Sequence, residues 1–182
     1  MRILVVHSTF DGQTARIAAR VAEAARRGGH EVEEIAVEAG ELVSRLTWSD
    51  AVIVGGAIRY GRHSTALEKA VRKHYSMLFM RPNAFFSVCM SAAGPKAKPA
   101  TAWGYIDEFI LRTGWQPGRI ASFGGALKWS RYGPLVKLMM RFIVRMAGGD
   151  TDTSRDHEYT DWNAVERFAA EFEYPLREPR AA

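Results

Sequence analysis

The sequence predicts an α/β fold in which a doubly wound, five-stranded parallel sheet carries helices on both of its faces. Two observations predict this fold. Five short apolar runs alternate with stretches of helical periodicity, an order that is typical of parallel strands joined by crossover helices. Hydrophobic residues also make up 47% of the 182 residues, which is enough for a substantial buried core.

The first elements follow from their apolar patterns. Residues 2–7 form a run that suits a strand buried on both faces, and the helix after it ends at Gly28-Gly29. Residues 31–37 alternate as an edge strand does, whereas residues 51–56 are apolar throughout. The same reasoning predicts the later elements: a helix at 64–74, a strand at 84–90, a helix containing 105–112, a strand at 120–127 and a closing helix at 160–173.

We expect a single domain over residues 1–176, with an inserted segment at 128–150 after the fifth strand and a tail at 177–182. Right-handed crossovers place the loops that follow parallel strands along one edge of the sheet, where ligands bind. The candidate functional residues therefore lie in three loops, at 8–14, 55–63 and 91–98.

The first loop joins a strand to the N-terminus of a helix and predicts a phosphate site. Helix-terminal N–H groups and hydroxyl side chains suit a phosphate dianion. No GxxxxGK[ST] or GxGxxG motif is present, which disfavours a nucleoside triphosphate or a dinucleotide. Asp11 would repel a phosphate, so we expect it to point outward or to cap the helix, with Arg16 offsetting its charge. The candidate residues are Ser8, Thr9, Asp11, Gly12, Gln13 and Thr14.

The second loop offers a surface for an aromatic ring. Tyr60 has a flat face, and Arg59 is a cation that would favour the anionic reduced form of a flavin near its N1–C2=O edge. We expect these two residues to be catalytic, and we regard His63 as an exposed loop histidine without a role. The ring contacts are expected from Ala57, Ile58, Arg59, Tyr60 and Gly61.

The third loop is small enough to let a ring edge lie against the backbone, through Ser91, Ala92, Ala93 and Gly94. Cys89, the single cysteine, precedes it in a buried strand; it can form no internal disulfide and fits a reducing compartment. We assign it no catalytic role. The histidines lack ligand spacing, so no metal site is expected.

The net charge of +5 is concentrated in one segment, whose basic residues are Lys128, Arg131, Lys137, Arg141 and Arg145. Residues 134–147 predict a helix on which the last three of these cations, four residues apart, form a stripe on an otherwise apolar surface. Such a helix suits an anionic membrane surface better than a nucleic acid. The alternative is that the helix packs on the domain or on a second subunit.

Several motifs resemble those of a known family. Residues 8–14 resemble the phosphate loop of flavodoxins. The motif Ile58-Arg59-Tyr60-Gly61 and, in the same order, residues 125–127, 148–153 and 159–162 resemble the flavodoxin-like, menaquinone-dependent protoporphyrinogen oxidases of bacterial haem biosynthesis. The likeness extends over about residues 1–175.

The resemblance implies a flavodoxin-like fold, FMN as the cofactor and protoporphyrinogen IX as the substrate. The substrate would lose six electrons in three two-electron steps to FMN, and a membrane quinone would reoxidise the flavin. The expected location is cytoplasmic, peripheral on the inner face of the cell membrane. The sequence does not indicate an oligomeric state.

Two other functions stay open. One is a flavodoxin that only carries electrons between proteins, although such carriers usually present an acidic face and the excess charge here is basic. The other is a NAD(P)H-dependent quinone reductase. No dinucleotide motif in the sequence supports this function, although such enzymes need none.

Overall fold

The computed structural model describes residues 1–94, 97–131, 133, 137–138 and 152–177. The strands of its main sheet are β1 (Arg2–Ser8), β2 (Glu31–Ala36), β3 (Ala51–Ala57), β4 (Asn83–Cys89) and β5 (Arg119–Gly124). The α-helices are α1 (Gln13–Arg27), α2 (Leu42–Trp48), α3 (Thr65–Lys73), α4 (Tyr75–Phe79), α5 (Pro99–Thr113) and α7 (Trp162–Arg177). The short elements are the 3-10 turns η1 (Val37–Ala39), η2 (Met90–Ala92) and η3 (Trp129–Arg131), and the strands β6 (Ala126–Leu127) and β7 (His157–Glu158).

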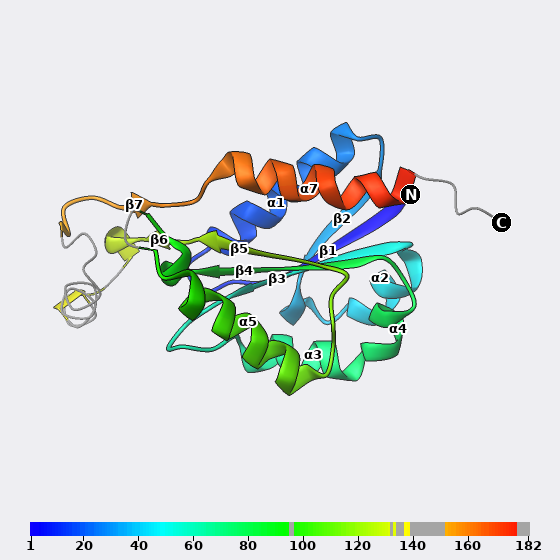
Figure 1. Cartoon of the computed structure of the whole chain (residues 1–182), viewed down its shortest axis with the longest axis horizontal. Coiled ribbons are helices and arrows are strands. Elements are labelled where there is room, and N and C mark those ends of the chain that lie inside the picture. Colours follow the sequence, from blue (N-terminus) through cyan, green and yellow to red (C-terminus); the bar gives the residue numbers. More distant parts are fainter. Residues whose placement is uncertain (95–96, 132, 134–136, 139–151, 178–182) are drawn as a thin grey trace.

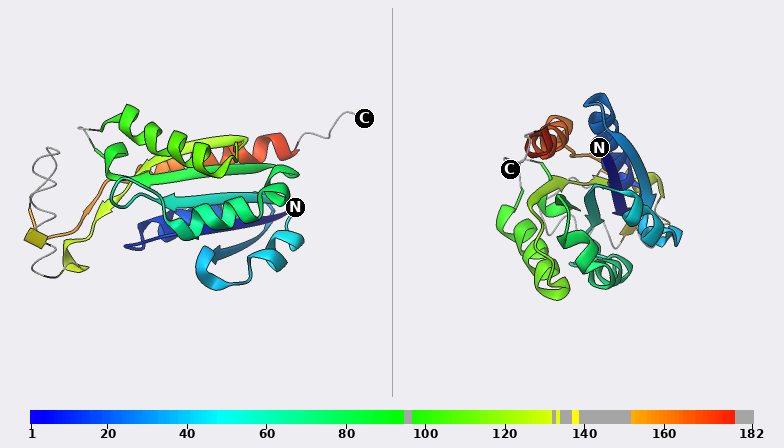
Figure 2. Two further views of the ribbon diagram at one scale, coloured as in Figure 1. Left: turned by 90° about the horizontal axis from the view of Figure 1, so that it is seen from below. Right: turned by 90° about the vertical axis from the view of Figure 1, so that its right-hand side faces the viewer.

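The main sheet has the strand order β2-β1-β3-β4-β5, and every neighbouring pair is parallel. Helices α1 and α7 cover one face, and α2, α3, α4 and α5 cover the other (Figures 1 and 2). The predicted doubly wound fold is therefore confirmed. The strand order reverses between β1 and β3, so the crevice between their carboxyl ends is the expected ligand site.

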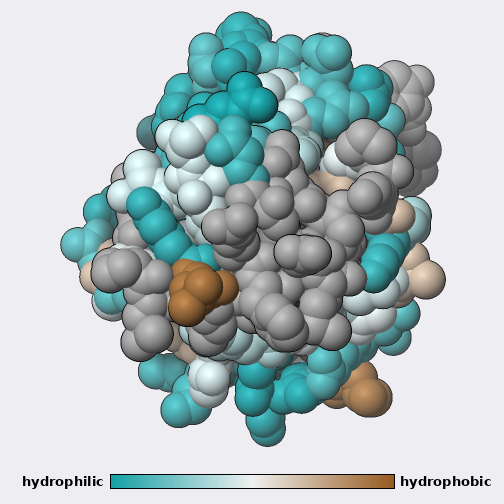
Figure 3. Space-filling view, turned by 90° about the vertical axis from the view of Figure 1, so that its left-hand side faces the viewer, coloured by the Kyte–Doolittle hydropathy of each residue, from teal (hydrophilic) through white to brown (hydrophobic). Residues whose placement is uncertain are grey.

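The carboxyl ends of the strands bring the three predicted loops to one end of the molecule. The β1 and β3 strands are in register there, with Ser8 opposite Gly56, and β3 is in turn paired with β4. Figure 3 looks onto this end, where the described surface is mostly hydrophilic and carries only isolated hydrophobic spots. The candidate site is thus built at one edge of the sheet by segments that lie far apart in the sequence.

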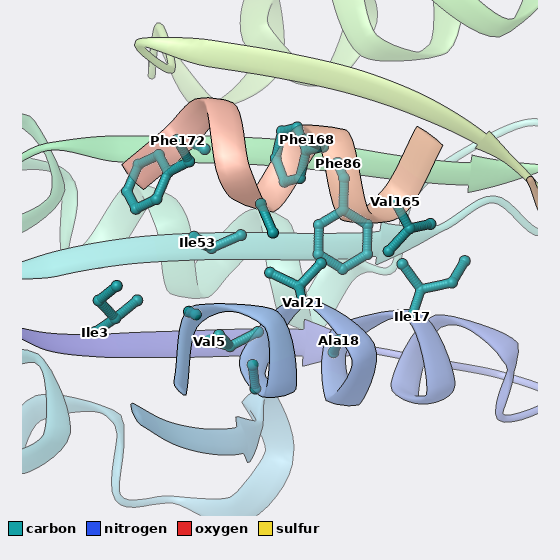
Figure 4. Packing of buried hydrophobic residues seen from close by; sticks show 14 of the residues in the cluster. Ile3, Val5, Ile17, Ala18, Val21, Ile53, Phe86, Val165, Phe168 and Phe172 are labelled. Atoms are coloured by element: carbon teal, nitrogen blue, oxygen red, sulfur yellow. The ribbon is translucent and has the colours of Figure 1, made fainter. Parts of the chain in front are cut away.

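Side chains of the strands alternate between two buried clusters because successive residues of a strand point to opposite faces. Ile3, Val5, Ile53 and Phe86 of the sheet pack against α1 and α7, and Phe168 of α7 belongs to the same cluster (Figure 4). A second cluster on the other face contains Leu4, Val6, Val54, Phe85, Ile106 and Trp115, among others. Full burial of one such side chain stabilises the fold by about 1.5–3 kcal/mol, so these two clusters stabilise the sheet from which the loops extend.

The structure corrects the prediction for the fifth strand. The parallel pairing of β5 ends at Gly124, and residues 126–127 pair instead with β7, antiparallel. The reason is the approach of another backbone: a Cβ at Gly124 would lie 2.5 Å from the carbonyl oxygen of Tyr159. The structure also contains two short helices that the sequence does not predict, α2 with seven residues and α4 with five. Helices of this length are too short to show clear helical periodicity.

Candidate functional site

The loop after β1 presents backbone donors to the carboxyl edge. Gly12 takes a left-handed conformation (φ 84°) at the start of α1, and its N–H donates to Thr9 Oγ1 over 3.0 Å. No side chain caps the helix, and its first turn contains no acidic residue. Thr14 is buried in that turn. The free helix-terminal N–H groups and the helix dipole therefore favour an anion here.

Ser8 is placed differently from its neighbours in the motif. It is buried, and its Oγ lies 2.7 Å from Ser64 Oγ and donates to Glu38 Oε1 over 3.3 Å. Ser64 in turn caps α3 by accepting a hydrogen bond from the N–H of Leu67. The Ser8 hydroxyl therefore joins β1 to α3, in addition to any part it has in phosphate binding.

Gln13 and Arg16 tie the first loop to the segment that precedes α7. Gln13 Nε2 donates to Thr160 Oγ1 over 2.8 Å, and Thr160 Oγ1 donates to the carbonyl of Gly124 over 2.7 Å. Arg16 donates to Gln13 Oε1 and forms an ion pair with Glu158. The ion-pair partner of Arg16 is thus Glu158, and Gly12 rather than Asp11 is the N-cap of α1.

The carboxylate of Glu158 is held in its charged form. Partial burial would raise the pKa of Glu158, but the hydrogen bond and the charge of Arg16 outweigh it, and the pKa lies below its usual range. Trp162 Nε1 also donates to Glu158, over 2.8 Å. Glu158 and Thr160 thus hold the segment before α7 against the start of α1; Thr160 lies in the motif 159–162, and Glu158 directly precedes that motif.

The second loop is a tight two-residue turn. Arg59 and Arg62 exchange backbone hydrogen bonds of 3.0 and 3.3 Å across Tyr60 and Gly61, whose φ angles are 52° and 79°. Positive φ at both central residues is typical of a type I′ turn. Tyr60 is the one non-glycine residue with positive φ in the described part of the chain, and its side chain is 75% exposed. The N–H of Ile58 donates to the Val88 carbonyl, which fastens the turn to β4.

The side chains of Arg59 and Tyr60 meet a residue that the sequence analysis did not select. The guanidinium carbon of Arg59 lies over the Phe10 ring, 5.2 Å from its centroid, and over the Tyr60 ring, 5.4 Å from its centroid. Phe10 is 41% exposed. The signal in the sequence was an aromatic residue within the loop 8–14, and the pairing of β1 with β3 is what brings this residue to Arg59.

The third loop begins with η2 and is closed by a hydrogen bond from the N–H of Lys98 to the Ser91 carbonyl, over 2.7 Å. Ala93 and Gly94 follow η2, and a Cβ at Gly94 would lie 3.2 Å from the ring of Tyr159. Tyr159, which the sequence placed in the motif 159–162 but not among the site residues, therefore packs on this loop. Cys89 is buried as predicted, and burial raises the pKa of its thiol.

His63 corrects a prediction, because it is buried rather than exposed. Its Nε2 lies 3.0 Å from Ser87 Oγ, and its ring packs against Phe85 and Phe109. Burial lowers the pKa of His63 to about 4, so the imidazole is neutral near pH 7. The chain can turn inward here because a Cβ at Gly56 would lie 2.7 Å from the imidazole, a space that glycine leaves open.

The basic segment is described only in part. Lys128 is half-buried, Arg131 ends η3, and Lys137 lies in a helical turn with Leu138. Arg141 and Arg145 lie outside the described residues, as do most of the predicted helix 134–147 and residues 148–151 of the glycine-rich motif. None of the helices in the described ranges is long and apolar enough to cross a membrane. In the same ranges, no group of three His, Cys, Asp or Glu side chains could hold a metal ion.

Known proteins resemble the chain in sequence and in fold. A family model of the flavodoxin domain matches residues 4–154. Protoporphyrinogen IX dehydrogenase (quinone) of Escherichia coli K12 is 34% identical over 185 residues, covering 98% of both chains. The protein of that name from Leishmania major is 33% identical over 172 residues, covering 94% of this chain and 74% of its own.

Solved flavodoxins share the fold. Flavodoxin 2 of Bacillus cereus gives a TM-score of 0.58 at 15% identity, covering 96% of this chain and 99% of its own. An archaeal flavodoxin gives 0.54 at 16% identity, covering 98% and 100%. The chain therefore belongs to the flavodoxin domain family and, within it, to the protoporphyrinogen IX dehydrogenase (quinone) family.

Proposed function

We propose that this protein is an FMN-dependent oxidoreductase that oxidises protoporphyrinogen IX to protoporphyrin IX and passes the electrons to a membrane quinone. The observation that carries the proposal is the similarity to protoporphyrinogen IX dehydrogenase (quinone) of Escherichia coli, which extends over 98% of both chains at 34% identity. The two alternatives, an electron carrier and a NAD(P)H-dependent reductase, have no comparable support.

The chemistry of the donors at the carboxyl edge fits FMN. Thr9, Thr14 and the first N–H groups of α1 would hold the phosphate, because the first turn of that helix contains no carboxylate to oppose it. Tyr60 and the turn around it would contact the flavin ring, and residues 91–94 would contact its edge. When bound, FMN supplies the acceptor for two electrons at a time.

The residues of the chain then have distinct parts. Tyr60 offers an exposed ring face, and Arg59 holds a positive charge beside it without an acidic partner among the described residues. We propose that these two residues touch the reactants. His63 and Cys89 lie beneath the loops as neutral, buried groups, so they would shape the site and exchange no proton with the substrate.

We further propose that the protein works at the surface of an anionic membrane. The five basic residues between 128 and 145, set in an apolar segment without any acidic residue, support this location. A quinone is confined to the membrane, so docking there would bring the site to its electron acceptor.

The deciding experiment mixes the FMN-loaded protein with protoporphyrinogen IX without oxygen and then adds a quinone. We expect loss of the oxidised flavin absorbance, the appearance of porphyrin fluorescence, and recovery of the flavin absorbance with the quinone. Parallel mixing with NADPH tests the reductase alternative. Loss of absorbance with NADPH but not with the porphyrinogen would refute the proposal, and no loss with either would favour the electron carrier.

A further inference from the structure

Arg59 is an exposed cation without an acidic partner in the described part of the chain. Its neighbour in the same turn, Arg62, lies 3.8 Å from a carboxylate oxygen of Glu68. On the adjoining helix, Arg16 is paired with Glu158. Arg59 therefore differs from these two arginines, since no carboxylate of the described residues forms an ion pair with it.

Phe10, Arg59 and Tyr60 form what we call the Arg59 cluster. The guanidinium lies over both rings, at 5.2 Å from the centroid of Phe10 and 5.4 Å from that of Tyr60. Ring faces attract a cation without accepting ordinary hydrogen bonds, so the N–H donors of the guanidinium stay available. The two contacts also restrict the side chain, which lowers the entropy lost when the guanidinium binds a ligand.

The backbone of the turn holds the cluster in an unfavourable conformation. An aromatic residue seldom adopts the positive φ of 52° that Tyr60 has here, and such outliers gather at functional sites. The hydrogen bonds between Arg59 and Arg62 and the anchor from Ile58 to β4 keep the turn in this form. The position of Arg59 is thus imposed by the fold.

We propose that the Arg59 cluster binds a carboxylate group of the substrate. The inference rests on the proposed function, because protoporphyrinogen IX carries propionate carboxylates whereas the quinone is uncharged. The planar guanidinium fork matches a carboxylate through paired hydrogen bonds. The cluster would therefore select the electron donor over the electron acceptor at a flavin that both reactants must reach.

The test compares Arg59→Gln with the matched control Arg62→Gln, which removes a paired arginine from the same turn. Each FMN-loaded variant is mixed rapidly with protoporphyrinogen IX, with its dimethyl ester, and, after reduction, with a quinone. We expect Arg59→Gln to raise the half-saturating concentration of the free acid about tenfold to a hundredfold, as loss of charged hydrogen bonds would. The preference for the free acid over the ester should therefore fall by the same factor in Arg59→Gln, whatever that change does to FMN or to the quinone reaction, and should stay within about twofold of the wild-type value in Arg62→Gln.

Variants of Phe10 provide a second test of the Arg59 cluster. Phe10→Leu should weaken binding of the free acid by a smaller factor, and Phe10→Tyr, which keeps the ring face, should restore it. Binding of protoporphyrin IX and of its dimethyl ester, followed by fluorescence in the same detergent, provides a readout without turnover. We expect the wild type to prefer the free acid and Arg59→Gln to lose that preference.

Two results would overturn the inference. The first is an equal rise in the half-saturating concentrations of the acid and the ester in Arg59→Gln. The second is a lowered reduction potential of the flavin in Arg59→Gln while the preference for the acid is unchanged, which would assign Arg59 to the flavin alone. Failure of the proposed function looks different, because the wild-type flavin would then not be reduced by the porphyrinogen at all. In that case the fluorescence binding measurement still tests the carboxylate site, because equal binding of protoporphyrin IX and its dimethyl ester by the wild type would exclude such a site.

Discussion

The buried histidine His63 should make the protein sensitive to mild acid. His63 has a pKa of about 4 in the folded protein against 6.5 when unfolded, because burial disfavours its charged form. Its neutral state therefore contributes stability that is fully present above pH 6.5 and is lost as the pH falls toward 4. The gap corresponds to about 3 kcal/mol of lost unfolding free energy by pH 4.

The perturbation is His63→Gln, which keeps an amide within reach of Ser87 Oγ, the group 3.0 Å from the imidazole, but cannot be protonated. Urea unfolding of both proteins at intervals between pH 7 and pH 4 measures the effect. We expect the variant to be less stable than the wild type at pH 7, because the packing against Phe85 and Phe109 is altered. The difference should shrink by about 3 kcal/mol toward pH 4.

Comparing the two proteins cancels the titration of the carboxylates, which both share. His74→Gln serves as a control, because that histidine is much more exposed and should show a smaller pH-dependent difference. If the stability difference between wild type and His63→Gln stays constant from pH 7 to pH 4, the imidazole is not buried as described and the reasoning fails.

The remaining predictions concern the phosphate loop and the basic segment. Thr14→Val should weaken FMN binding by about 1.5–3 kcal/mol and leave riboflavin binding unchanged, because only FMN has a phosphate; equal losses in fluorescence titrations would contradict the assignment. Gln13→Ala removes hydrogen bonds to Thr160 and Arg16, so the free energy of unfolding should fall by about 2 kcal/mol and the melting temperature by about 4–8 °C. An unchanged melting temperature in calorimetry would show that these hydrogen bonds do not stabilise the fold. Changing Lys137, Arg141 and Arg145 together to Gln should lower the binding constant for anionic vesicles by about two orders of magnitude, because each cation contributes about 1 kcal/mol. Co-sedimentation measures this constant, and the FMN spectrum should stay intact. A folded triple variant that still sediments fully would exclude electrostatic docking through these residues.

The sequence by itself determined the architecture and predicted the edge of the sheet at which a ligand would bind. The apolar runs at 2–7, 51–56 and 84–90 have the length and composition of strands covered on both faces, and helical periodicity between them implied parallel pairing. The loop from Ser8 to Thr14 at the start of a helix was recognisable because hydroxyl residues, a glycine and helix-terminal donors occur together within a few residues. Such features are local, so the order of residues alone expresses them.

Only the tertiary structure decided how side chains from different loops meet. Phe10 and Arg59 come together because β1 and β3 are neighbours in the sheet, with Ser8 opposite Gly56. Tyr159 reaches Gly94 because the chain leaves the sheet after Gly124. These contacts depend on strand order, register and the volume left by single glycines, which are properties of the whole packed chain and have no periodic signature in the sequence.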